Sequence, residues 1–158
     1  MHRLVAALVG GVLLVTLIGG VLVGGPTVDS AETTTVTVVD APTTTPLVTY
    51  EVAIADTHAA RVQGLSGTEA LPAGSGMLFV HPREDTHAYV MREMAYPIDI
   101  IFIDATGAIT TIHTAAPEDV PESQLTRYRG TGRYVLEVPA GSVEIGRASC
   151  RERVYVLV

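Results

Sequence analysis

The chain has 158 residues, and its ten basic residues, all Arg, are outnumbered by 17 Asp and Glu, which gives a formal net charge of -7. With 47% hydrophobic and 17% charged residues it is too apolar for a disordered protein, and its length suits one domain. The acidic balance argues against a nucleic-acid partner, because such binding needs a basic face that displaces phosphate counterions. A single cysteine, Cys150, excludes an internal disulfide.

The N-terminus contains an uncharged apolar run over residues 4–23. Twenty helical residues span roughly 30 Å, the hydrocarbon thickness of a bilayer, whereas the apolar part of a signal peptide has only about 7–15 residues. We therefore expect residues 1–25 to form an uncleaved signal-anchor, with a cleaved signal peptide as the alternative. Because Arg3 precedes the run and Asp29 follows it, the protein is expected to be a single-pass cell-membrane protein with its C-terminal domain outside. Cleavage would instead give a secreted protein.

Residues 26–46 are rich in Thr and Pro, a composition typical of extended linkers. We expect an extracytoplasmic tether here. The alternating segment 35–39 leaves open an edge strand within it.

From residue 47 onward the pattern predicts a mainly β domain that ends near residue 144. Residues 48–54 alternate apolar and polar, as a half-buried strand does. Asp56 or Thr57 can cap a short helix that ends at Gly64. Residues 98–103 are almost wholly apolar and predict a central strand, and residues 104–107 predict a hairpin turn. Further strands are expected over residues 77–80, 86–91, 108–113 and 133–138, with a long loop over residues 115–131. The expected fold class is a small sandwich- or barrel-like domain with one or two short helices.

Several motifs in this domain resemble those of the domain-of-unknown-function 192 family, over about residues 49–143. They are Arg61 with Gly64-Leu65-Ser66, then GMLFV at residues 76–80, VMREM at 90–94, PIDI at 97–100, FID at 102–104 and YVLEVPAG at 134–141. The resemblance implies a small mainly β fold, often behind an export or anchor segment, and no established activity. The acidic, Lys-free composition resembles family members from halophilic archaea.

The segment after residue 144 departs from the family pattern. Residues 145–155, IGRASCRERVY, resemble the translation of a common sequencing adapter. We expect residues 145–158 to be a non-native tail, and an unbroken genomic read through codon 158 would contradict this. The alternative is a genuine terminal strand over residues 153–158.

The best candidate for a ligand site is the connection between the strands expected at residues 86–91 and 98–103. It brings together a cation, an anion, thioethers and a phenol beside an apolar strand, as small-molecule sites do. The candidate ligand-binding residues are Met91, Arg92, Glu93, Met94, Tyr96 and Asp99. The alternative is that Arg92 pairs with Glu93, Asp99 or another carboxylate and only fixes the connection.

No catalytic, metal or cofactor site is expected. His81 and His87, with Glu84 or Asp85, have the residue types of a metal site, but they are interpreted more simply as solvated loop residues. Two functions stay open. The first is a membrane-tethered binding or interaction module for an unknown ligand or protein of the cell envelope. The second is a hydrolase of envelope polymers that uses Asp or Glu.

Overall fold

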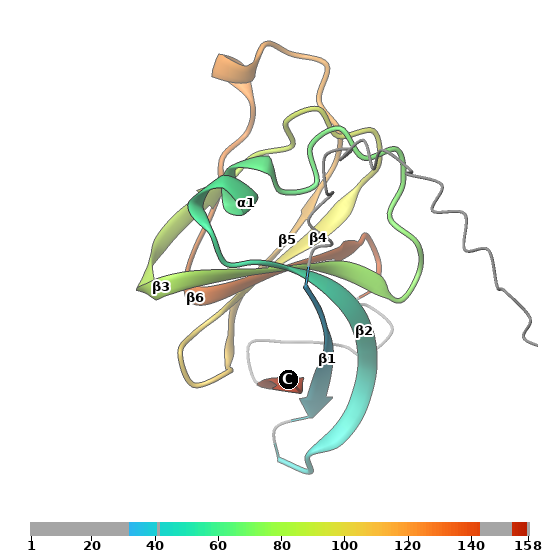
Figure 1. The fold of residues 1–158 in the computed structure, drawn as a ribbon, viewed down its shortest axis with the longest axis vertical. Helices are drawn as coiled ribbons and strands as arrows, with labels where there is room; N and C mark the ends of the chain where they lie inside the picture. The colour runs from blue at the N-terminus through green and yellow to red at the C-terminus, as the bar shows by residue number, and fades with distance from the viewer. Residues whose placement is uncertain (1–31, 41, 143–152, 158) are drawn as a thin grey trace, which may run out of the picture.

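The computed structural model describes residues 32–40, 42–142 and 153–157. Within these ranges seven strands form one strongly coiled sheet in the order β5-β4-β6-β3-β2-β1-β7 (Figure 1). The elements are β1 (Thr33–Asp40), β2 (Thr45–Ala55), α1 (His58–Gln63), β3 (Ser75–Tyr89), β4 (Ile98–Ile103), β5 (Ile109–Ala115), the 3-10 turn η1 (Glu122–Gln124), β6 (Tyr128–Pro139) and β7 (Arg153–Leu157). The prediction of a mainly β domain with little helix is confirmed. The described strands form one continuous sheet, however, and not the two packed sheets of a sandwich.

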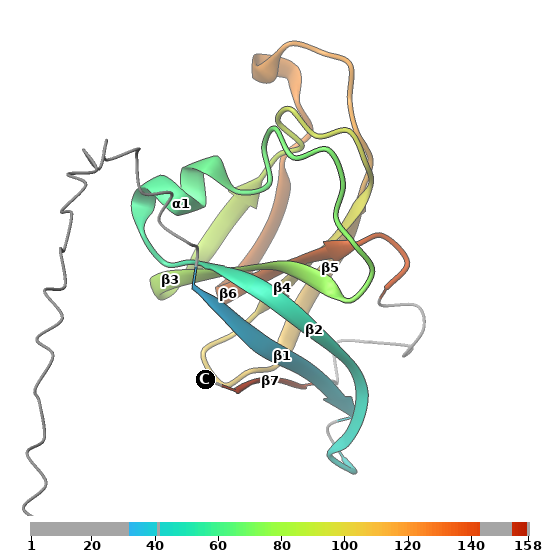
Figure 2. The ribbon, with the colours of Figure 1, turned by 45° about the vertical axis from the view of Figure 1, so that its right-hand side comes forward.

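One parallel pair places the helix. β2 and β3 run parallel, with Val52 opposite Gly76, whereas the other neighbouring strands are antiparallel. Parallel neighbours need a crossover connection, and here it contains α1. Figures 1 and 2 show α1 lying over one face of the sheet beside β3 and β6.

The sheet buries side chains on both faces. One cluster includes Val36, Tyr50, Leu78, Ile101 and Leu136, and the other includes Phe79, Met91, Ile98, Phe102 and Val135. All six residues of β4 are buried, so the predicted central strand covered on both faces is confirmed. Burial of each large apolar side chain stabilises the fold by about 1.5–3 kcal/mol.

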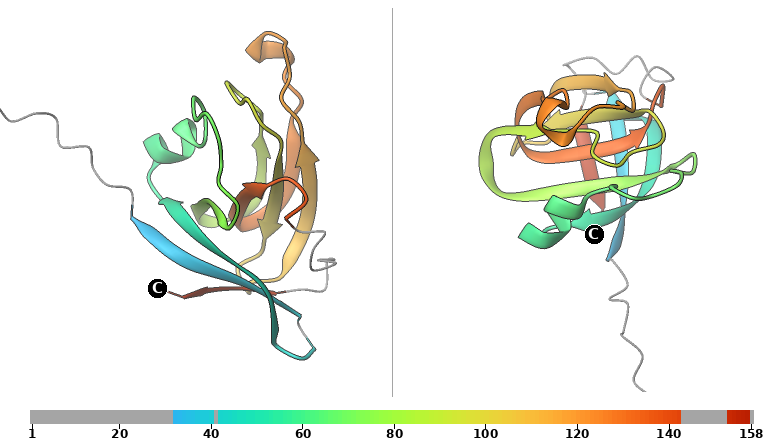
Figure 3. Two further views of the ribbon diagram at one scale, coloured as in Figure 1. Left: turned by 90° about the vertical axis from the view of Figure 1, so that its right-hand side faces the viewer. Right: turned by 90° about the horizontal axis from the view of Figure 1, so that it is seen from above.

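The expectation of an extended linker over residues 26–46 is wrong for Thr33–Asp40, which form β1 and pair with β2. Val36 and Val38 are buried in the core, and this burial offsets the entropy that a free linker would keep. The edge-strand alternative is therefore the correct one for this segment, although β7 covers its outer side. The left view of Figure 3 shows β1 and β2 side by side as a long antiparallel ribbon within the sheet.

β7 pairs antiparallel with β1, with Thr37 opposite Tyr155. A strand at this place agrees with the terminal-strand alternative for the end of the chain. The pairing reflects the β-forming composition of Arg153–Leu157 and does not test where the coding DNA came from. The adapter origin of residues 145–158 stays a prediction.

The expected transmembrane helix lies in residues 1–25, outside the described ranges. Within those ranges no helix has the length and apolar character needed to cross a bilayer.

Two strands are longer than predicted. β3 continues through the expected break at His81-Pro82, because a register shift between Val80 and Asp85 absorbs the extra residues as a bulge. Residues 128–131 belong to β6, so the expected loop over residues 115–131 is wrong there. The glycines of this part of β6 fit their neighbours, since a Cβ on Gly130 would lie 2.3 Å from the Phe102 ring.

Candidate functional site

A pocket of about 490 Å³ lies between α1, the loop that follows it, β3 and the connection before β4. Its polar lining comprises His58, Arg61, Gln63, Ser66, His81, His87, Tyr89, Arg92 and Glu137. Its apolar lining includes Phe79, Met91, Met94 and Ile98, which belong to or pack on the core cluster of the same face. The pocket thus combines an apolar wall with convergent polar groups, as small-molecule sites do.

Helix α1 positions Arg61 at the pocket. The Thr57 hydroxyl accepts a hydrogen bond from Ala60 N at 3.1 Å, and Gly64 ends the helix with a positive φ of 52°. The predicted cap and stop are therefore confirmed. Arg61 donates from Nη1 to the carbonyl oxygen of Val80 at 2.9 Å and to that of Asp56. These bonds fix the guanidinium group between the helix and β3.

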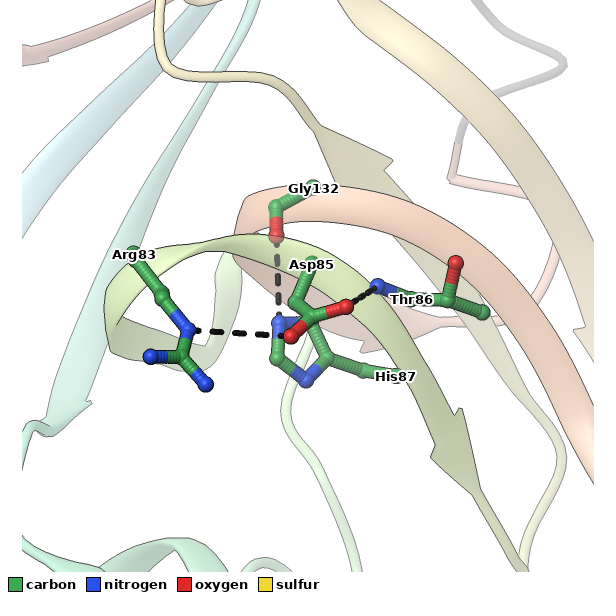
Figure 4. Close-up of polar contacts among 5 residues, drawn as sticks. All are labelled: Arg83, Asp85, Thr86, His87 and Gly132. Atoms are coloured by element: carbon green, nitrogen blue, oxygen red, sulfur yellow. Dashed lines mark hydrogen bonds and ion pairs between the residues drawn. The ribbon is translucent and has the colours of Figure 1, made fainter.

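The bulge of β3 brings two histidines together. The His81 and His87 rings stack. Figure 4 shows His87, which donates a hydrogen bond from Nε2 to the Gly132 carbonyl oxygen at 3.1 Å. The Asp85 carboxylate forms an ion pair with Arg83, with Oδ2 3.7 Å from Nε, and accepts a hydrogen bond from the Thr86 backbone N–H at 2.8 Å. The interpretation of His81 and His87 as solvated loop residues is wrong, since both line the pocket and are only partly exposed. Among the described residues no group of three or more His, Cys, Asp or Glu is placed to hold a metal ion.

His81 and Tyr89 form a neutral hydrogen-bonded pair. His81 Nε2 and the Tyr89 hydroxyl lie 2.9 Å apart. Burial, then the neighbouring His87 and Arg61, lower the pKa of His81 to about 4. Burial, with the nearby Glu137 carboxyl, raises the pKa of Tyr89 far above its usual value. Both groups are therefore uncharged at neutral pH.

Glu137 is the buried carboxyl group of the pocket. It is 5% exposed and stands on β6 between Met77 of β3 and Ile100 of β4. No hydrogen bond or ion pair from the described residues reaches its carboxyl group, and burial raises its pKa to about 8. A perturbed carboxyl group inside a pocket is a common mark of a functional site.

Three of the six predicted site residues line this pocket: Met91, Arg92 and Met94. Arg92 donates to the Val62 carbonyl oxygen and, at 3.4 Å, to the Ser66 hydroxyl, so it ties the connection to the helix and the loop that follows. Its carboxylate partner is Glu122 at 3.6 Å. This contact agrees with the alternative that Arg92 pairs with Glu93, Asp99 or another carboxylate, and the carboxylate is that of Glu122.

Glu93 and Tyr96 are in the connection but do not line the pocket. Glu93 has a φ of 52°, and its carbonyl oxygen accepts a hydrogen bond from Gly67 N at 3.0 Å. The Tyr96 hydroxyl is hydrogen-bonded to the Thr68 hydroxyl. Both residues therefore join the connection to the loop after α1 and shape the pocket indirectly.

Asp99 lies on the opposite face of the sheet, away from this pocket, so the structure does not bring it together with the other predicted site residues. Ile98 and Ile100 on either side of it pack in the cluster beneath the pocket, so strand alternation directs Asp99 away. It is 2% exposed and accepts hydrogen bonds from the Thr114 hydroxyl at 2.7 Å and Gly141 N at 2.9 Å. These bonds fasten the start of β4 to β5 and to the turn after β6.

Sequence reasoning missed Arg61, Tyr89 and Glu137 as members of the pocket. For Glu137 a signal was present: it is the single charged residue of the run YVLEV at residues 134–138, and it lies two positions after Val135, on the same face of the strand. For Arg61 no local pattern indicates a ligand site, because its place depends on how the crossover positions α1.

Comparison with known proteins supports the resemblance drawn from the motifs. A crystal structure of a candidate transcription regulator from Sinorhizobium meliloti 1021 is similar, with 28% identity and a TM-score of 0.70 over 80% of this chain and 95% of that one. So is a protein of unknown function from Novosphingobium aromaticivorans DSM 12444, with 25% identity and a TM-score of 0.67 over 82% and 89% of the two chains. No curated protein matches. The profile of the DUF192 family, described as "Uncharacterized ACR", matches residues 38–148, and the chain therefore belongs to the DUF192 family.

Proposed function

We propose that the protein is a membrane-tethered binding module outside the cytoplasm and that the pocket is its ligand site. The observation that carries the proposal is the convergence of Arg61, Arg92 and the buried Glu137 on one cavity of about 490 Å³ with an apolar wall. The proposed membrane tether rests on the apolar run of residues 4–23. The acidic, Lys-free composition of the whole chain supports an organism adapted to high salt as its source. The partner is a small molecule or a group of the cell envelope.

Hydrolysis of envelope polymers is the second candidate, and Glu137 favours it. A carboxyl group whose pKa is raised to about 8 by burial can act as a general acid near neutral pH. Most glycosidases need two carboxyl groups that face each other across the bond they cleave. Glu137 is the single carboxyl group among the described residues that line the pocket. Binding without turnover is therefore the better-supported function.

A nucleic-acid role is disfavoured for this chain, although one similar protein is a candidate transcription regulator. The net charge of -7 repels phosphate backbones, and a nucleic-acid partner would need a basic face.

The test is a thermal-shift and turnover screen of the purified full chain with envelope fragments and small metabolites. Met94→Trp fills the pocket from its rim, and Val120→Trp, at an exposed position outside the lining, is the matched control. Saturable binding without turnover, lost in Met94→Trp and kept in Val120→Trp, supports the module. Turnover that Glu137→Gln abolishes would instead establish the hydrolase. Binding that survives Met94→Trp would place the ligand elsewhere.

A further inference from the structure

The charge of the pocket is set by two arginines and one carboxyl group. Arg61 and Arg92 line the cavity, and Glu137 is the single carboxylic side chain among its described lining residues. Because burial raises the pKa of Glu137 to about 8, this group keeps its proton and carries no charge at neutral pH. The pocket is therefore positively charged although the whole chain is acidic.

Arg61 has no anionic partner in the part of the chain that the structure describes. Its guanidinium group donates to two backbone carbonyl oxygens, those of Val80 and Asp56, and neither of the two ion pairs in the described ranges involves it. Carbonyl oxygens hold a guanidinium group in place but do not cancel its charge. A fixed and partly buried guanidinium group beside a cavity is well suited to bind a carboxylate or phosphate.

Arg92 is only weakly neutralised. Its partner Glu122 lies 3.6 Å away, and the Glu122 side chain is 69% exposed. Ion pairs of this kind contribute little, because water screens them. Its other bonds go to the neutral Val62 carbonyl oxygen and the Ser66 hydroxyl. The second cation of the pocket is therefore also able to bind an anion.

The same cavity has an apolar side. Phe79, Met91 and Ile98 are each 1% exposed and line the pocket together with the half-buried Met94. The geometry points to a small organic anion as the ligand, an apolar body that carries one carboxylate or phosphate group, with the anionic group on Arg61 and Arg92. This inference rests on the proposed binding function, and it names the class of ligand.

Glu137 contributes by staying protonated. As a neutral acid it can donate a hydrogen bond to an uncharged oxygen of the ligand, and it does not repel the anionic group. An ionised carboxylate at the same place would cancel part of the positive charge of the two arginines. The buried acid therefore allows a pocket with a carboxyl group in its lining to select anions.

Three fluorinated probes of nearly equal shape test the inference with the full chain. They are 4-(trifluoromethyl)benzoate, its neutral amide, and 4-(trifluoromethyl)phenylphosphonate, and their binding is followed by fluorine NMR titration. We expect the benzoate or the phosphonate to bind at least about ten-fold more tightly than the amide, as one charge-assisted contact gives. The better of the two anions identifies the anionic group.

Variants of Arg92 separate charge from scaffolding. Arg92→Gln should remove the preference for the anion, Arg92→Lys should keep part of it, and Arg127→Gln, at an exposed position outside the pocket, should change nothing. If Arg92→Gln fails to fold, the comparison of the anionic probes with the amide on the wild-type chain still tests the anion preference. Equal binding of amide and anions would overturn the anion preference and leave the binding function standing. No binding of any probe at millimolar concentration would overturn the ligand class, while the wider ligand screen tests the function separately.

Discussion

The imidazole rings of His81 and His87 stack at a centroid distance of 3.5 Å with 11° between their planes. Two protonated imidazoles at this distance would repel each other, and His87 already gives its Nε2 proton to the Gly132 carbonyl oxygen. His81 is neutral at neutral pH, because burial, His87 and Arg61 lower its pKa to about 4. Protonation of His81 in acid would therefore place a positive charge in this stack, at the wall of the pocket.

His81 should make the domain less stable in acid. Its pKa is about 4 in the folded protein and about 6.5 in the unfolded chain, so unfolding takes up a proton between these values. The free energy of unfolding should fall as the pH drops from 6.5 to 4, and His81→Gln should reduce this fall. Urea unfolding followed by tyrosine fluorescence at several pH values measures it, with the exposed His58→Gln as control. An unchanged acid dependence in His81→Gln would refute the prediction.

Glu137 should have the opposite effect. Its pKa is about 8 in the folded protein and about 4.5 in the unfolded chain, so its contribution is fully present below pH 4.5 and is lost as the pH rises through 8. The loss is at most about 1.4 kcal/mol for each pH unit in this window. Glu137→Gln should therefore gain stability relative to the wild type as the pH rises from 5 to 9. A difference in unfolding free energy between Glu137→Gln and wild type that stays constant from pH 5 to 9 would contradict the raised pKa of Glu137.

Asp99→Ala should destabilise the fold without affecting the pocket. The change removes the carboxylate acceptor of the Gly141 N–H and of the Thr114 hydroxyl. Water can replace it at the exposed Thr114, so the cost is about 1–3 kcal/mol, mainly from the partly buried Gly141 N–H. Probe binding should stay within about two-fold of wild type, since Asp99 faces the other side of the sheet. Equilibrium unfolding and the fluorine NMR titration measure the two effects on one sample. Loss of binding in a folded variant would return Asp99 to the site.

Gly130→Ala should cost about 1–3 kcal/mol, the usual range for overpacking, because the new Cβ would lie 2.3 Å from the Phe102 ring. In the Phe102→Ala background the same change should cost much less, since the ring is gone. The four unfolding free energies form a double-mutant cycle. Additive costs would mean that the strand backbone, and not the ring, rejects the side chain.

The anchor prediction concerns where the whole chain is found. Full-length protein should stay with membranes after alkaline and high-salt washing, and protease added to intact cells should digest the β domain. A chain that starts at Glu32 should be soluble and folded, because it keeps β1, whereas a start at Pro46 removes β1 from beside β2. A β domain that is protected until the cells are lysed would contradict the expected topology.

Local patterns predicted several elements well and the assembly of the pocket only in part. The helix from Thr57 to Gly64 and the buried strand Ile98–Ile103 follow from capping and hydropathy, which act over a few residues. Met91 and Arg92 were found because their motif is local. The position of Asp99 away from the pocket could not be predicted, because strand alternation puts it on the opposite face from Ile98 but does not tell which face carries the pocket.

Longer-range features were not available from the pattern. The register shift of β3 depends on pairing with β6 across more than 40 residues, and it decides that His81 and His87 meet. The burial of Glu137 depends on the two neighbouring strands and on the helix that covers that face. The Thr- and Pro-rich composition of residues 26–46 predicted a linker in place of β1, since the valines of β1 become core residues only when β2 lies beside them.

The start of β1 at Thr33 also limits how far the domain can lie from a membrane. If the anchor ends at Gly25, only residues 26–32 separate the bilayer from the sheet, and these extend to roughly 25 Å at most. A free segment up to residue 46 would have reached roughly 70 Å. The pocket would then sample the layer just above the lipid headgroups, so ligands released at the membrane surface would meet it before those held in the outer wall.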